Sequence, residues 1–206
     1  MRAGLAVLVA VFALAPSAAV AASDTATSGS LEGQVELRLK TLTRQSAPTR
    51  TNVPQQRKRI KSALAVLEEG VIARINDIRR SRGLRPLRHN GRLAVAADFH
   101  SRDMARRGYF EHDSANGTAF WRRIERFYPS RGFRSWTVGE NLLWATDSYG
   151  PSFAVREWMH SPPHRENILS RDWREIGIGA VTVASAPGEY GGRSVTILTA
   201  DFGARS

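Results

Sequence analysis

The stretch Glu175–Phe202 reads EIGIGAVTVASAPGEYGGRSVTILTADF, and it decides the fold class. Its two ends, Glu175–Val183 and Ser194–Phe202, alternate with a period of two and are rich in β-branched residues, which is typical of strands. The segment between them, Ala184–Arg193, carries one proline and three glycines, as a long hairpin loop would. The sequence therefore predicts an antiparallel strand pair at this end of the chain.

Helical periodicity dominates the chain before these strands. Between Arg57 and Ser81 apolar residues recur at steps of three and four, and Gly83 and Pro86 follow as end signals. Further helices are predicted over Arg92–Gly108 with Asn90 as N-cap, over Thr118–Phe127 with Thr118 as cap, and over Pro151–His160. His100 lies on the apolar face of the second helix, where a hydrogen-bonded core histidine is expected. Helices first and strands last indicate an α+β fold with an antiparallel sheet.

The first 56 residues differ in composition from the rest. Residues 1–22 have the pattern of a secretory signal peptide, with a charged end, a short apolar run and small residues before a cleavage site. Residues 23–56 are rich in Ser, Thr, Ala, Gln and Pro and are predicted to form a flexible linker. We expect one domain over residues 57–206, in a secreted, extracellular monomer that has no transmembrane segment once the signal peptide is removed.

The composition limits the classes of partner. The formal net charge is +11, and lysine contributes only Lys40, Lys58 and Lys61 to it. Such a charge favours anionic partners. The arginines are scattered rather than gathered in a dense stripe, so nucleic acid is not the expected partner. Cysteine is absent, which excludes disulfides, thiolate metal ligands and a thiol nucleophile.

Two imidazoles and a carboxylate lie among aromatic residues in the second half of the chain. Glu140 lies in Gly139-Glu140-Asn141, which we predict to be a turn after an edge strand at Trp136–Val138. His164 follows the helix-stopping pair Pro162-Pro163, and His112 ends the motif Tyr109-Phe110-Glu111-His112. Neutral imidazoles and a carboxylate suit Zn²⁺ with a fourth position for water, although no HExxH pair is present. A buried polar network without chemistry is the alternative.

Five short motifs occur in one order between Glu68 and Gly203: SRDMARRGYFEH, GEN, WMHSPPHRENIL, IGIG and ADFG. In this combination the chain resembles the bacterial branch of the CAP superfamily, the SCP-like extracellular proteins. The resemblance implies a three-layer α-β-α sandwich with a mainly antiparallel central sheet. It also implies a cleft lined by two histidines and two acidic residues, with His112, Glu140 and His164 at matching positions. Ser161 occupies the position of the second acidic residue, which leaves the set incomplete.

Three functions are open at this point. The first is a secreted binding module whose polar cleft holds a divalent metal such as Zn²⁺, a lipid, glycan or cell-envelope ligand, or both; its candidate residues are His112, Glu140, Asn141, Ser161 and His164. The second is a Zn-dependent extracellular hydrolase in which His112 and His164 hold the metal and Glu140 is the general base. The third is a basic protein that binds anionic polymers through its arginines. The incomplete acidic set favours the first.

Overall fold

The computed structural model describes residues 53–146 and 149–206. The predicted signal peptide and residues 23–52 of the predicted linker lie outside the described residues. Two compact units are distinguished: one contains Ser62–Ser206, and of the other, Ala15–Lys61, the structure describes residues 53–61. The elements are α2 (Val53–Ser81), β1 (Arg88–His89), α3 (Gly91–Arg107), α4 (Phe120–Glu125), β2 (Trp136–Thr146), α5 (Pro151–His160), α6 (Pro162–Leu169), β3 (Glu175–Val183), a 3₁₀ turn (Gly188–Tyr190) and β4 (Val195–Arg205).

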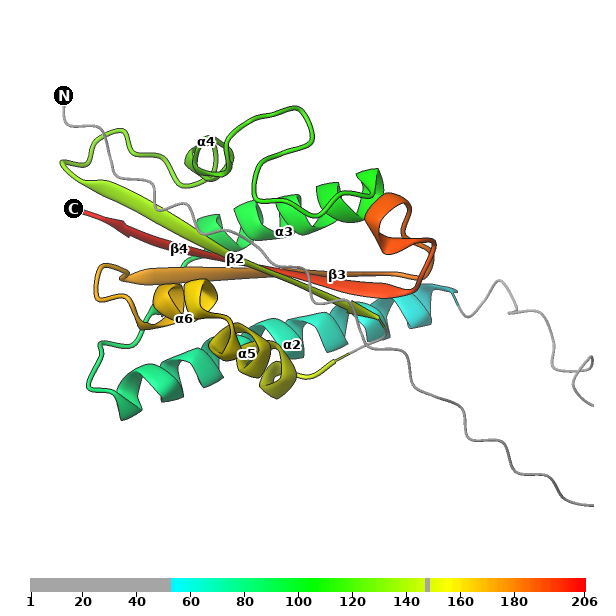
Figure 1. The fold of residues 1–206 in the computed structure, drawn as a ribbon, viewed down its shortest axis with the longest axis horizontal. Coiled ribbons are helices and arrows are strands. Elements are labelled where there is room, and N and C mark those ends of the chain that lie inside the picture. The colour runs from blue at the N-terminus through cyan, green and yellow to red at the C-terminus, as the bar shows by residue number, and fades with distance from the viewer. Residues whose placement is uncertain (1–52, 147–148) are drawn as a thin grey trace, which may run out of the picture. The chain divides into compact units, whose positions relative to one another are not determined.

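The sheet contains four strands in the order β1-β3-β4-β2. Strand β4 pairs antiparallel with both β3 and β2, whereas the short β1 runs parallel to β3. Helices cover both faces: α3 and α4 lie on one, and α2, α5 and α6 lie on the other (Figure 1). The predicted α+β class with a mainly antiparallel sheet between helical layers is therefore confirmed.

Helix α3 rests directly on the sheet because β3 carries glycine where the two meet. A Cβ at Gly177 would overlap the backbone of α3 at Ala94, and a Cβ at Gly179 would overlap it at Asp98. Ser101 of the same helix donates a hydrogen bond to the Gly179 carbonyl at 2.9 Å, and its hydroxyl lies 2.8 Å from that of Thr199 in β4. This close approach fixes the polar residues of α3 over the centre of the sheet.

The opposite face of the sheet carries the largest apolar core. It is built from α2, α5, α6 and the alternate residues of β3 and β4, and it includes Val71, Ile75, Trp158, Ile168, Ile178, Leu198 and Phe202. The predicted periodicity of α2 is confirmed, since Leu67, Val71 and Ile75 are its buried apolar positions. The Asn90 cap of α3 is also confirmed, because its side chain accepts from the amides of Arg92 and Leu93.

The predicted turn at Gly139–Asn141 is wrong. Strand β2 runs through it and pairs Glu140 with Asp201 of β4. Glycine is required at position 139 for close packing rather than for a turn, because a Cβ there would overlap the ring of Trp173. Since successive strand residues face opposite sides of a sheet, Glu140 and Asn141 point into different layers.

The pair Pro162-Pro163 both ends one helix and begins the next. Helix α5 stops at His160 as predicted, but α6 starts at Pro162, where the missing proline amides cost no hydrogen bond. His164 is therefore a helical residue rather than a loop residue. The predicted Thr118 cap is also wrong, since α4 begins at Phe120 after Ala119, which makes no side-chain cap bond.

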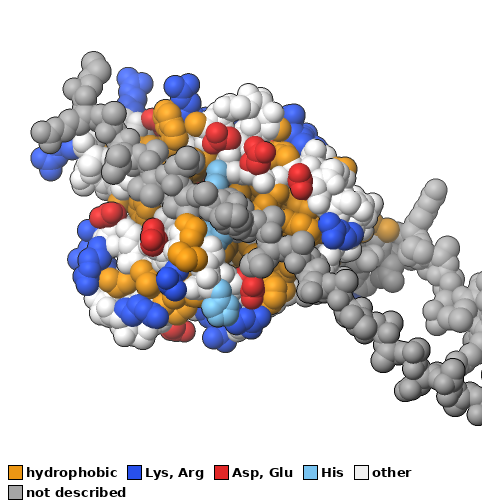
Figure 2. Space-filling view, in the orientation of Figure 1, with side chains coloured by type: hydrophobic (Ala, Val, Ile, Leu, Met, Phe, Trp, Pro, Cys, Tyr) orange, Lys and Arg blue, Asp and Glu red, His pale blue; other side chains and the backbone are white. Residues whose placement is uncertain are grey.

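Lysine and arginine side chains are spread around the face shown in Figure 2 and do not form a single stripe there. This distribution agrees with the scattered arginines of the sequence. Within residues 53–146 and 149–206, no helix is both long and apolar enough to span a membrane.

Candidate functional site

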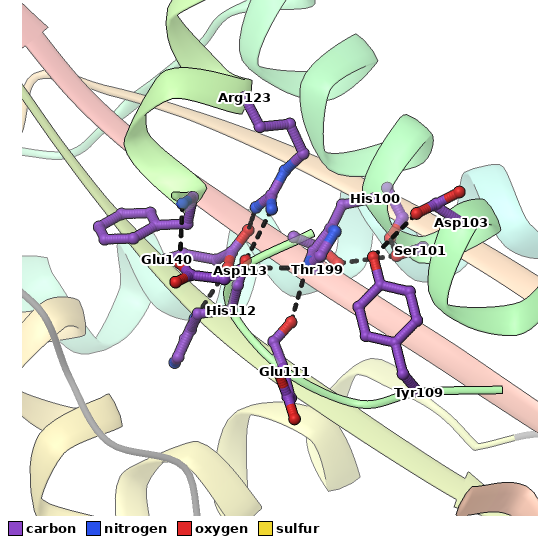
Figure 3. Close-up of polar contacts among 12 residues, drawn as sticks. His100, Ser101, Asp103, Tyr109, Glu111, His112, Asp113, Arg123, Glu140 and Thr199 are labelled. Atoms are coloured by element: carbon purple, nitrogen blue, oxygen red, sulfur yellow. Dashed lines mark hydrogen bonds and ion pairs between the residues drawn. The ribbon is translucent and has the colours of Figure 1, made fainter. Parts of the chain in front are cut away.

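A buried cluster of charged side chains surrounds Glu140 on the face of the sheet that α3 and α4 cover. The residue is only 2% exposed, although it lies in the edge strand β2. Arg123 of α4 donates from Nη2 to Glu140 Oε2 and from Nη1 to the carbonyl of His112, the latter at 2.7 Å (Figure 3). Arg123 is itself only 1% exposed, so the two opposite charges neutralise each other out of contact with water.

His112 binds the second oxygen of the same carboxylate. Its Nδ1 lies 2.7 Å from Glu140 Oε1. Burial alone would raise the pKa of Glu140, but the charge of Arg123, followed by those of His100 and His112, lowers it below its usual value. The carboxylate is therefore ionised and can only accept, so His112 donates through Nδ1. In the neutral ring Nε2 is then a free acceptor, and it has no hydrogen-bond partner in the described part of the chain.

His100 of α3 completes this side of the cluster. It is fully buried, as the sequence predicts for a core histidine, and its Nε2 donates to the Glu111 carbonyl at 2.9 Å while lying 3.9 Å from Glu140 Oε1. Burial lowers its pKa to about 4, although the charge of Glu140 opposes the change. The ring is therefore neutral at pH 7. It also fixes the loop between α3 and α4 that carries His112 (Figure 3).

Asp201 of β4 faces Glu140 directly across the strand pair. It is fully buried, and neither carboxyl oxygen has a hydrogen-bond partner among the described residues. Burial, together with the negative charge of Glu140, raises the pKa of Asp201 well above its usual value. Two ionised carboxylates that face each other across paired strands would repel each other strongly in an environment without water. The pair therefore carries one negative charge, on Glu140.

A second polar group lies on the other face of the same strand. Asn141 donates from Nδ2 to the carbonyl of His164 at 3.0 Å. Asn167 of α6 donates from Nδ2 to the Glu140 carbonyl at 3.1 Å and to Asn141 Oδ1 at 2.8 Å. These bonds fasten the first turns of α6 to β2. Asn141 therefore helps to hold α6 in place, and its role as a ligand-binding residue remains a prediction.

His164 is held by this attachment close to the edge strand. It is 5% exposed, and its Nε2 has no hydrogen-bond partner within the described residues. Burial, and after it the charge of His112, lowers the pKa of His164 to about 4. His112 and His164 come from different layers of the fold, the first from the loop before α4 and the second from α6. Both present a buried, unpaired Nε2.

The site differs from the predicted metal trio. Within the described residues, no group of three or more histidine, aspartate or glutamate side chains is placed to share a metal ion. Both oxygens of Glu140 are already bound by Arg123 and His112. A buried polar network is present, in which Glu140 accepts from Arg123 and His112. Ser161 separates α5 from α6 and makes no side-chain cap bond, and its role as a ligand-binding residue remains a prediction.

Sequence reasoning missed Arg123, Asp201 and Asn167. Arg123 is one of many arginines, and nothing local distinguishes it from the exposed ones. Asp201 carried a signal, because it is a lone carboxylate within the apolar strand VTILTADF. An unpaired charge in a strand with burial on both faces indicates either a buried partner or a protonated acid.

Comparison with known proteins gives one family. The model of CAP, the cysteine-rich secretory protein family, matches residues 72–201. YkwD of Bacillus subtilis (strain 168) is 32% identical over 124 residues, which are 60% of this chain and 46% of that protein. The membrane protein YlbC of the same organism is 31% identical over 112 residues, or 54% of this chain and 31% of that protein.

A solved structure agrees with this result. The crystal structure of an extracellular protein containing an SCP domain, from Bacillus anthracis str. Ames, matches with a TM-score of 0.56 and 25% identity, covering 79% of this chain and 49% of that one. The present chain thus spans less than half the length of each of these three relatives.

Proposed function

The chain belongs to the cysteine-rich secretory protein (CAP) family, and from this premise we propose that it is an extracellular binding module whose ligand is held by His112 and His164. The observation that carries the proposal is the pair of buried, unpaired Nε2 atoms on these two rings. Buried polar atoms are normally hydrogen-bonded, and those left unpaired in a native protein indicate an absent partner. Here the partner would be the ligand.

The surroundings of each ring suit a ligand site. The pKa of His164 is lowered to about 4, so its ring is neutral at pH 7. Glu140 fixes the tautomer of His112 by accepting from Nδ1, which leaves the lone pair on Nε2. Carboxylate bonding to the second ring nitrogen is the usual support for a metal-binding histidine. Glu140 is therefore a positioning residue.

A divalent metal such as Zn²⁺ fits this pair of donors. His112 and His164 would supply neutral imidazole nitrogens, which are preferred ligands of Zn²⁺, and water or a ligand atom would complete the coordination. Glu140 does not fit as a third ligand, because Arg123 and His112 bind its oxygens. When bound, the metal would order the cleft for a lipid, glycan or cell-envelope ligand.

The geometry supports binding better than hydrolysis. A general base must reach the proton of an attacking water, but Glu140 is 2% exposed and fully engaged. Its lowered pKa also makes the carboxylate a weak base. The third function, binding of anionic polymer by dispersed surface charge, needs neither histidine.

Calorimetric titration of the full chain with Zn²⁺ tests the proposal. We expect saturable binding that is lost in the His112→Ala/His164→Ala variant and retained in His89→Ala/His160→Ala, which removes two exposed histidines instead. Glu140→Gln should weaken binding by about 10- to 100-fold, as expected for loss of an outer-shell partner. Equal affinity in the two histidine double variants would contradict the proposal. Hydrolysis of a model ester by wild type and not by Glu140→Gln would favour the enzyme instead.

A further inference from the structure

A cavity of about 240 Å³ lies between the end of α2 and the loop that follows α6. It is lined by Arg79, Leu84, Arg85, Arg171 and Arg174, so four of its five lining residues are arginines. Neither Asp nor Glu is among these described lining residues. Both segments lie at the same end of the sheet (Figure 1). This arginine pocket takes no part in the site described above.

Arg79 forms the floor of the arginine pocket and is 1% exposed. Its Nε donates to the Arg85 carbonyl at 2.9 Å, and its Nη1 donates to the carbonyls of Ile168 and Ser170, both at 2.8 Å. These carbonyls hold the guanidinium in one orientation, and the end of α6 offsets part of its charge. No carboxylate of the described chain forms an ion pair with it. A buried cation without a full counter-charge is costly.

Arg174 is held close by in a similar way. Its Nη1 donates to the carbonyls of Arg171, Asp172 and Trp173 at 2.6, 3.3 and 3.0 Å. After burial, its positive charge is the next cause that lowers the pKa of Arg79. Capping of α6 explains Arg79 alone. It does not explain why three further arginines converge on the same cavity.

We propose that the arginine pocket binds a phosphate group. Guanidinium groups present paired N–H donors whose spacing matches phosphate oxygens, and they remain charged at all physiological pH values. Arg79 and Arg174 are already oriented by the backbone, so little side-chain freedom is lost on binding. Arg85 and Arg171 are exposed, form no ion pair within the described residues, and would close over the anion from the rim.

The arginine pocket is distinct from the histidine site. Ser170, whose carbonyl binds Arg79, lies six positions after His164, or about 9 Å along a helical path. The proposal does not depend on metal binding. Its failure would leave the function of His112 and His164 untouched, and the reverse also holds.

Titration of the full chain with inorganic phosphate at low ionic strength tests the pocket. The test variant is Arg85→Gln/Arg171→Gln, because these side chains form none of the hydrogen bonds that orient Arg79. The matched control is Arg92→Gln/Arg131→Gln, which removes the same charge from exposed residues elsewhere. Calorimetry gives the affinity, and the ¹⁵N-detected Nε–H signal of Arg79 gives the place of binding.

We expect saturable phosphate binding that shifts the Arg79 signal and weakens by about tenfold in the test variant, with no change in the control. Equal loss in both variants, or binding without a shift at Arg79, would overturn the proposal, since either would indicate diffuse attraction. Absence of binding in wild type would also overturn it.

A second arm identifies the source of the phosphate. Sedimentation with phosphatidylglycerol vesicles, compared with phosphatidylcholine vesicles, tests a lipid headgroup. Co-sedimentation with the first that is lost in the test variant assigns the pocket to a lipid phosphate. Phosphate binding without co-sedimentation assigns it to free or polymer-borne phosphate. Co-sedimentation that the test variant retains, without phosphate binding, would refute the pocket.

Discussion

Glu140→Gln and Asp201→Asn are the same chemical change at two facing carboxyls, yet we expect opposite consequences. Glu140 carries the charge that neutralises Arg123, and both side chains are buried. Removing one partner of a buried ion pair costs about 3 to 5 kcal/mol of the free energy of unfolding, since the other charge is left unpaired. Asp201 is already neutral, so its replacement by a neutral amide should cost less than about 1 kcal/mol.

The two penalties should also respond to pH in opposite directions. The pKa of Glu140 is lowered from 4.5 in the folded state, so its stabilisation is present above pH 4.5 and is lost as the pH falls. The penalty of Glu140→Gln should therefore shrink on acidification. The pKa of Asp201 is raised from 3.8, so its stabilisation is present below pH 3.8 and is lost as the pH rises towards the folded-state value. Asp201→Asn should therefore gain stability relative to wild type as the pH rises.

Urea unfolding followed by tryptophan fluorescence between about pH 2 and 8 measures both effects, since the Glu140 contribution changes below pH 4.5, provided that the slopes of the transitions agree. A double-mutant cycle with Arg123→Met supplies the control. If Glu140 stabilises the protein through Arg123, Glu140→Gln should cost far less in the Arg123→Met background than in wild type. Equal penalties for the two carboxyl variants at pH 7 would refute the assignment of a single charge to Glu140.

Three further outcomes are expected. Gly177→Ala should lower the free energy of unfolding by about 1 to 3 kcal/mol, because its methyl group would push α3 off the sheet. Thermal unfolding measures this, and Gly91→Ala, which has open space around it, is the control that should leave the stability unchanged. Asn167→Ala should cost about 1 to 3 kcal/mol, since the Glu140 carbonyl and Asn141 would lose a donor; urea unfolding measures this, and a neutral result would exclude Asn167 as the attachment of α6. His164 has a pKa of about 4 in place of 6.5, so its contribution to stability should be lost as the pH falls from 6.5 to 4; His164→Gln should flatten this acid limb, and an unchanged limb would show that the ring is not buried neutral.

The pattern of apolar residues predicts the helices and strands of this fold well where the buried positions recur with a single helical or strand period. The alternation in β3 and β4 and the three-and-four spacing in α2 each reflect one packed face, and the structure confirms them. Two predictions that bear on the site were wrong, because a glycine and a proline were interpreted only as signals of local backbone structure. Gly139 was predicted to form a turn, but it is small because Trp173 packs against it. Pro162 was predicted only to end a helix, but it also begins one.

The candidate site could be predicted only in part, because its members meet through tertiary contacts. The resemblance indicated His112, Glu140 and His164 but not how they would lie. Arg123 is supplied by a short helix 17 positions before Glu140, and Asp201 comes from the neighbouring strand. The spacing of residues in the sequence cannot predict the Coulomb repulsion between Glu140 and Asp201 that keeps Asp201 protonated. That outcome depends on burial and on Arg123, both of which are properties of the folded chain.

The opposite orientation of Glu140 and Asn141 has a consequence for how the chain reaches its native state. An edge strand can slip along its neighbour during folding, and a shift by one residue exchanges the two faces of every side chain. In β2 such a slip would bury Asn141 beside Arg123 and turn the carboxylate of Glu140 towards α6. Both layers would then contain an unmatched polar group, so the misaligned pairing would be rejected. The adjacent residues Glu140 and Asn141 thus favour a single register for the outermost strand.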